Sequence, residues 1–194
     1  MDKEFIEFLK DAYSGGLCNE YRDEIRKCHE DKLSLVRLAM RQQSIPYIAT
    51  KMHDGVITKA YLQKVFGDFL NGFVLEDCDG VDGYKYSWYV DYDCNKDLVV
   101  ESDVVHISWT VGASVVVPQT KAPTIYISNR SKVHLVGEGF NTINVKLFDK
   151  SELIVEDIDE NSEIVVYRYS DMANVVKGKY CLGKVKVFDK ELKI

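Results

Sequence analysis

The chain has 194 residues, of which 46% are hydrophobic and 29% charged, a composition that is ordinary for a soluble globular protein and excludes a mostly disordered one. No apolar run is long enough to span a bilayer, and the first residues, MDKEFIEFLKD, carry acids where a signal peptide needs bases. The five cysteines are widely spaced and form no CxxC pair, which indicates neither a disulfide framework nor a zinc cluster. We therefore expect a cytoplasmic protein with reduced cysteines and no membrane contact.

The net charge of −6 is concentrated in one segment. Residues 76–105 hold nine acidic residues against two lysines, whereas residues 1–75 and 128–194 each hold eleven acids and eleven bases. A basic stripe of the kind that follows a phosphate backbone is not visible in this pattern. We therefore expect no nucleic-acid partner, and the neutral repeats also argue against a solenoid that imitates DNA.

Residues 1–75 are predicted to form a helical domain of about four helices. A short first helix ends at Ser14-Gly15-Gly16, and a longer second helix runs from a cap at Asn19 to about Met40. Pro46 suits the first turn of a third helix, and Thr58 is a suitable cap for a fourth. Apolar residues recur at helical spacing within these segments, which indicates that the helices pack on one another.

Residues 76–97 form an acidic, aromatic junction that contains one alternating strand. The residues that share one face of this strand are Tyr84, Tyr86, Trp88, Val90 and Tyr92. One interpretation is a ligand-binding face on which the rings stack a glycan or a nucleotide, while Asp91 and Asp93 accept hydroxyl hydrogen bonds. The alternative is that the rings are buried between the helical domain and the strands that follow.

The loop at the start of this junction holds three candidate metal ligands, Asp77, Asp79 and Asp82. The alternation of oxygen ligands and glycines suits calcium, but the spacing departs from an EF-hand because Trp88 stands where the bidentate acid belongs. The alternative is a solvated turn. We expect no metal and no cofactor.

Residues 98–194 are predicted to form a short single-stranded β-solenoid, similar to a β-helix. Six short units each open with a small residue and then alternate apolar and polar residues: SKVHL at Ser131, TINVK at Thr142, SELIV at Ser151, SEIVV at Ser162, ANVVK at Ala173 and GKVKV at Gly183. No unit can bury its apolar face alone, but stacked strands join these faces into one column. The fold class is therefore α+β. The last unit has only a few residues after it, so its open end could pair with a second chain.

No catalytic residue is predicted. The sequence holds no GxSxG, HExxH, Walker or GxGxxG motif. The four histidines lie far apart, and His106 and His134 fall at outward positions of alternating strands, where we expect surface histidines. An enzyme whose groups converge from scattered positions is left open.

Three segments, YKYSWYVDYDCNKDLVV, TKAPTIYISNRSKVHLV and SEIVVYRYSD, carry a family resemblance. In them the chain resembles an uncharacterised family of small proteins from gut bacteria and their phages, with a helical front, a tyrosine-rich acidic junction and short solenoid rungs. The resemblance implies the α+β fold and a phage or mobile-element origin, and it brings no activity. The solenoid is also similar in rung length to bactofilin-type filament formers, although it lacks their glycine-rich turns.

These observations lead to three hypotheses about function. The first is a non-enzymatic protein-interaction module that presents a rigid solenoid surface to a protein partner. The second is a glycan- or nucleotide-binding module that uses the face from Tyr84 to Tyr92. The third is a structural protein that assembles through its last solenoid rung.

Overall fold

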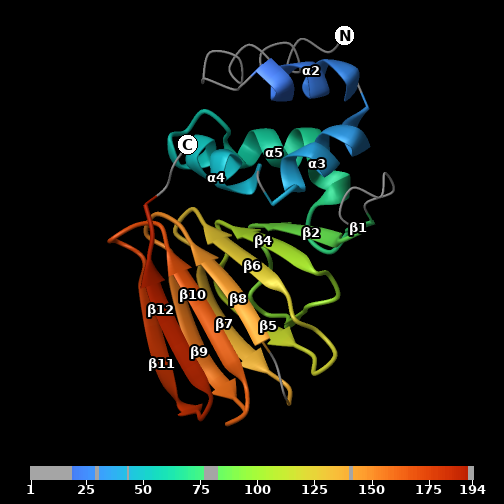
Figure 1. Cartoon of the computed structure of the whole chain (residues 1–194). Coiled ribbons are helices and arrows are strands. Elements are labelled where there is room, and N and C mark those ends of the chain that lie inside the picture. The colour runs from blue at the N-terminus through green and yellow to red at the C-terminus, as the bar shows by residue number, and fades with distance from the viewer. Residues whose placement is uncertain (1–18, 29–30, 43, 77–82, 140–141, 192–194) are drawn as a thin grey trace.

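The computed structural model describes residues 19–28, 31–42, 44–76, 83–139 and 142–191, and shows a group of helices followed by a β-solenoid (Figure 1). The predicted α+β fold is confirmed. The helices are α2 (Asn19–Cys28), α3 (Lys32–Met40), α4 (Ile45–His53), α5 (Lys59–Phe66) and the 3-10 turn η1 (Gly67–Phe69). The short helix predicted before residue 14 lies outside the described residues.

Local side-chain chemistry explains where these helices begin. The Thr58 side chain accepts a hydrogen bond from the Tyr61 backbone N–H at the start of α5, as predicted, and Pro46 occupies the first turn of α4. The prediction of one helix through Met40 is wrong. Asp31 caps a new helix there by accepting from the backbone N–H of Leu33, so α2 and α3 are separate.

The solenoid consists of two sheets whose strands alternate along the chain. Sheet A has the order β1 (Val74–Glu76), β2 (Lys85–Val90), β4 (Val104–Ser108), β6 (Thr124–Ser128), β8 (Thr142–Leu147), β10 (Glu163–Arg168) and β12 (Lys184–Asp189). Sheet B has the order β11 (Asn174–Cys181), β9 (Glu152–Ile158), β7 (Lys132–Gly137), β5 (Val111–Val117) and β3 (Leu98–Val99). All neighbouring strands are parallel except β1, which pairs antiparallel with β2.

Each predicted repeat unit is half of one solenoid coil. The six units are the strands β7 to β12, taken in chain order and assigned alternately to the two sheets. Ile125 pairs with Val145, which pairs with Val166, so a full coil takes 20 or 21 residues. Strand β2 lies in the predicted junction but pairs parallel with β4, and it is therefore part of the solenoid sheet.

The small residues that open most units occupy buried corners, where the chain turns from one sheet to the other. The opening residues with exposed fractions of 3% or less are Ser131, Ser151, Ser162 and Ala173. At Gly183, which is also buried, a Cβ atom would lie 2.7 Å from the backbone oxygens of both Asp159 and Ser162. Larger side chains do not fit at this corner.

We expect Gly183→Ala to lower the free energy of unfolding by about 1–3 kcal/mol, because the added methyl meets backbone oxygens that cannot move freely. Urea unfolding measures this change. Gly67→Ala is the matched control, since a Cβ atom there has no neighbour within 4 Å and the backbone is already helical. Equal stability of the two variants would contradict the corner packing.

The helices lie as a layer over the outer face of sheet A, above β2, β4 and β6, and β11 and β12 lie at the opposite edge of the solenoid from β1 and β2 (Figure 1). One hydrophobic core joins the helices to Tyr86, Trp88 and Val90 of β2 and to Tyr126 of β6. A second core fills the space between the two sheets. The helices and the solenoid therefore share buried surface.

Candidate functional site

The aromatic strand β2 is buried apart from its first residue, Lys85. Tyr86 and Trp88 are 4% and 1% exposed and belong to the core beneath the helices, with Val90 beside them. A sugar or base could reach these rings only if the helices moved away. The burial of Tyr86 and Trp88 therefore favours the packing alternative, since large aromatic side chains stabilise a core by the area they bury.

The other four residues of the proposed ligand face are scattered. Tyr84 is 42% exposed, and Tyr92 packs against the solenoid core rather than the helical one. The Asp91 carboxylate forms an ion pair with Lys59 Nζ at 2.8 Å, which ties the loop to α5. Asp93 accepts hydrogen bonds from the backbone and side chain of Asn95, and these bonds lower the pKa of its carboxyl.

The three candidate calcium ligands, Asp77, Asp79 and Asp82, lie outside the described residues. In the part of the chain that the structure describes, no group of three or more histidine, cysteine, aspartate or glutamate side chains is placed to hold a metal ion.

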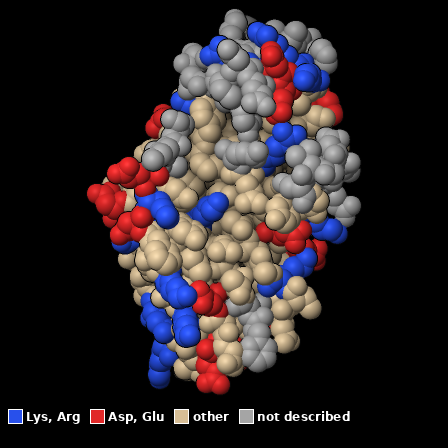
Figure 2. Space-filling view, in the orientation of Figure 1, with Lys and Arg blue, Asp and Glu red and all other residues tan. Residues whose placement is uncertain are grey.

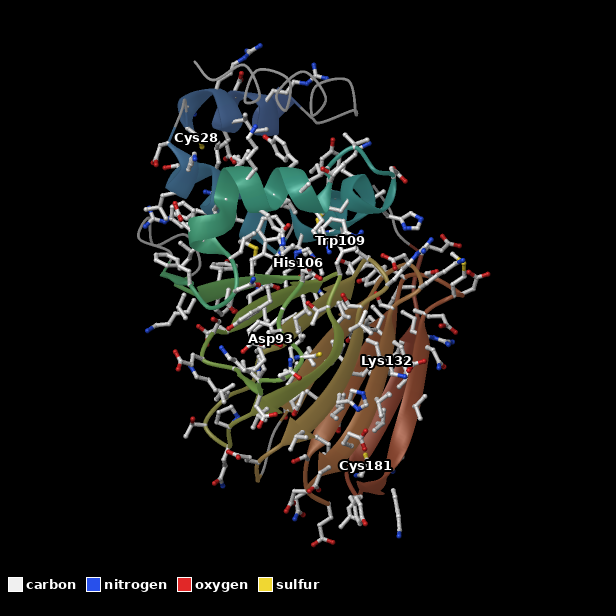
Figure 3. All side chains as sticks on the ribbon, turned by 180° about the vertical axis from the view of Figure 1, so that it is seen from behind. Cys28, Asp93, His106, Trp109, Lys132 and Cys181 are labelled. Atoms are coloured by element: carbon white, nitrogen blue, oxygen red, sulfur yellow. The ribbon has the colours of Figure 1, made fainter. Side chains whose placement is uncertain are left out.

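His106 corrects a second expectation, because it is fully buried rather than at the surface (Figure 3). It does lie on the outer face of sheet A, but the helices cover that face. Its ring stacks on Trp88 with 5.6 Å between centroids, and Nε2 lies 2.9 Å from Ser128 Oγ. His134, in contrast, is half-buried, and its Nδ1 lies 2.7 Å from Glu156 Oε1.

The hydrogen bonds around His106 assign a neutral ring. Ser128 donates its hydroxyl to Asn129 Oδ1, so Ser128 Oγ accepts from His106 and the proton is on Nε2. Nδ1 is buried and has no hydrogen-bond partner among the described residues. Burial without a counter-charge lowers the pKa of His106 to about 3. His106 and Ser128 resemble a base next to a nucleophile. In the part of the chain that the structure describes, however, no acid bonds to Nδ1, and the helices cover both residues.

The open end of the solenoid is the most prominent exposed feature of the described chain. Val187 continues the inward column of Ile125, Val145 and Val166, which are 0–1% exposed, yet Val187 itself is 42% exposed. Among the described residues no strand lies beyond β11 or β12. The exposed hydrophobic side chains of this last coil are Val176, Tyr180, Leu182, Val187 and Phe188. Such an edge is a template for a further strand.

The two edge strands differ in how freely they can pair. In β11 the pairing register shifts between Lys177 and Tyr180, and Lys177 occupies the inward column of Val155. Its ammonium donates to the Gly183 carbonyl at 3.2 Å. Bulges and inward charges are common means of blocking an edge. Strand β12 pairs with β10 over six residues without any shift, so its outer edge is regular.

The outer edge of β12 offers backbone groups at alternate residues. The backbone N–H groups of Lys184 and Lys190 donate to the carbonyls of Ser162 and Arg168, just before and at the end of β10. Because backbone groups alternate in direction along a strand, those of Val185, Val187 and Asp189 point to the open edge.

The open end is also basic. Residues 174–190 contain five lysines and a single acidic residue, Asp189. Lysine side chains gather over β11 and β12 at the lower left of the molecule (Figure 2). The Lys186 ammonium contacts Glu163 at 2.7 Å on the neighbouring strand. A neutral repeat region thus ends in a positively charged, partly apolar surface.

No family model, curated protein or solved structure matches the chain. The resemblance to small proteins of gut bacteria and their phages therefore stays a prediction. No helix in the described ranges has both the length and the apolar character that crossing a membrane requires.

The sequence predicted that the last rung is open. It did not reveal that this rung is basic, or that Lys177 and a register shift block the edge of β11. The signal was present in the aligned repeat units. SELIV ends in Val155 at the inward position, whereas ANVVK ends in Lys177 at the same position. SKVHL, SEIVV and GKVKV also end in an apolar residue at this inward position, so the charge of Lys177 is the exception among them.

Proposed function

We propose that this protein is a non-enzymatic, cytoplasmic protein-interaction module whose binding site is the open end of the solenoid at β12. The observation that carries the proposal is the regular outer edge of β12, on which Val187 is exposed in a column that is otherwise buried. Burying that column beneath a partner strand would remove apolar surface from water and pair free backbone groups.

Three further observations support this function. His106 and Ser128 are the described residues that most resemble a catalytic pair, and both are buried away from any substrate. The helices share a core with β2 and β6, so the solenoid is held on a rigid support and the edge is presented in one fixed geometry. The described cysteines, Cys28, Cys94 and Cys181, are free thiols, as suits a reducing compartment.

The test is a comparison of the proteins captured by tagged variants from a lysate of the native host. We expect Val187→Asp to lose a partner that the wild-type chain retains, because a carboxylate in this column must be desolvated when a strand covers it. Mass spectrometry with quantitation measures the captured proteins.

Val111→Asp is the matched control, since Val111 is an exposed valine at the start of β5, far from the open end. We expect it to capture the same proteins as the wild-type chain. Capture that is unchanged by Val187→Asp, or lost equally in both variants, would contradict a binding site at β12.

A further inference from the structure

Opposite charges face each other between successive coils of the solenoid. In sheet B, Lys132 on β7 contacts Glu152 on β9 at 2.8 Å. In sheet A, Glu163 on β10 contacts Lys186 on β12 at 2.7 Å. Cross-strand pairs of this kind stabilise neighbouring strands in register. At β12 the series stops after a basic strand, with Lys184 and Lys186 both on the outer face.

From this pattern we propose that the β12 edge binds an acidic, extended segment of a different protein as an added strand of sheet A. The inference rests on the proposed function and names the chemistry of its partner. The added strand carries acidic residues beside Lys184 and Lys186, and apolar residues beside Val185 and Val187, where they extend the core. Main-chain hydrogen bonds supply affinity, and the alternating side chains supply specificity.

The outer face adds one more requirement for the partner strand. Phe188 stacks on Tyr167 of β10, with ring centroids 5.8 Å apart, and is 45% exposed. The position beside Phe188 on an added strand therefore suits an aromatic residue, which extends the stack. The complete pattern is acidic, apolar, acidic, apolar, aromatic.

The same charges discriminate against a second copy of this chain. Two open ends that face each other bring the lysines of both last coils together, and Lys177 places a further charge in the column of each sheet B. A head-to-tail arrangement would pair the six residues of β12 with β1, which has only three. Both arrangements of two copies are therefore less favourable than an acidic strand.

The experiment measures binding of a fluorescent peptide in which glutamate and valine alternate before a phenylalanine, by anisotropy at low ionic strength. The matched peptide has lysine in place of glutamate. We expect the acidic peptide to bind the wild-type chain and the basic peptide not to bind. In the double variant Lys184→Glu/Lys186→Glu, we expect affinity for the acidic peptide to fall about tenfold or more and the basic peptide to bind instead.

Two controls separate strand addition from simple charge attraction. An acidic peptide that is N-methylated at alternate residues keeps its charge but cannot donate to the edge, and we expect its binding to be lost. Lys132→Glu reverses a charge on sheet B, away from β12, and we expect it to leave binding unchanged. Circular dichroism confirms that each variant is folded.

Equal binding of the N-methylated peptide, or no binding of the acidic peptide, would overturn the inference. The inference would also be overturned if the molecular mass of the chain alone rose with concentration and the double variant Lys184→Glu/Lys186→Glu lowered it. A second copy would then occupy the edge. If the acidic peptide fails but a partner is still lost with Val187→Asp, the partner chemistry is wrong and the proposed function stands. If capture is independent of Val187, the proposed function itself fails.

Discussion

Trp88→Ala is expected to lower the free energy of unfolding by about 3–5 kcal/mol, among the largest effects of any single truncation in this chain. Trp88 is 1% exposed, stacks on His106 and donates from Nε1 to Ser108 Oγ at 3.3 Å. Its removal leaves a cavity at the surface shared by the helices and sheet A, and the Ser108 hydroxyl loses the hydrogen bond from the indole. Urea unfolding followed by circular dichroism measures the change.

The control for this variant is Tyr84→Ala, which truncates an aromatic residue that is 42% exposed just before the same strand. We expect a change of about 1 kcal/mol or less, as at most surface positions. A stable Trp88→Ala variant that loses binding of a glycan or nucleotide would contradict the packing of β2 and restore the ligand-face interpretation.

Stability is expected to fall as the pH is lowered through the ordinary titration range of histidine, because of His106. The pKa of His106 is lowered to about 3 in the folded chain, whereas a histidine in the unfolded chain titrates near 6.5. Below pH 6.5 the unfolded state therefore binds a proton that the folded state does not, which favours unfolding. The free energy of unfolding falls by up to about 1.4 kcal/mol per pH unit, which gives a loss of about 1.5–2 kcal/mol between pH 6.5 and pH 5.

Urea unfolding at pH 7.5, 6.5 and 5 tests this dependence. His106→Gln has no group to protonate, so we expect its free energy of unfolding to lose this part of the pH dependence, even if the variant is less stable at every pH. His53→Gln removes an exposed histidine at the end of α4 and is the matched control for a histidine-to-glutamine change. An identical slope in wild type and His106→Gln would contradict a buried, neutral ring.

The solenoid could be predicted because the repeating apolar positions in its sequence are the positions that become buried. Alternation with a period of two fixes which side chains face inward, and Val145, Leu153 and Val166 are all fully buried, as the units indicated. The pattern could not show that two units make one coil. That depends on corners such as Ser151 and Ser162, which turn the chain between sheets through tertiary packing.

The candidate site was harder to predict, because burial on the outer face of a sheet depends on what covers it. The alternation in β2 placed Trp88 and Tyr86 on one face but could not say that helices lie over it. His106 was expected at the surface for the same reason, since its strand position is outward and only the helices bury it. The inward place of Lys177 was missed because it is set by the pairing of Lys177 with Val155 on the neighbouring strand.

Amide hydrogen exchange of the complex with a captured partner tests most directly whether β12 is the binding edge. The backbone N–H groups of Val185 and Val187 point to the open edge, so in the free chain they exchange faster than those of Lys184 and Lys186, which face β10. A partner strand at β12 should slow exchange at Val185 and Val187 while exchange in β5 is unchanged. A partner that binds tightly but leaves these two amides exchanging as in the free chain would contradict it.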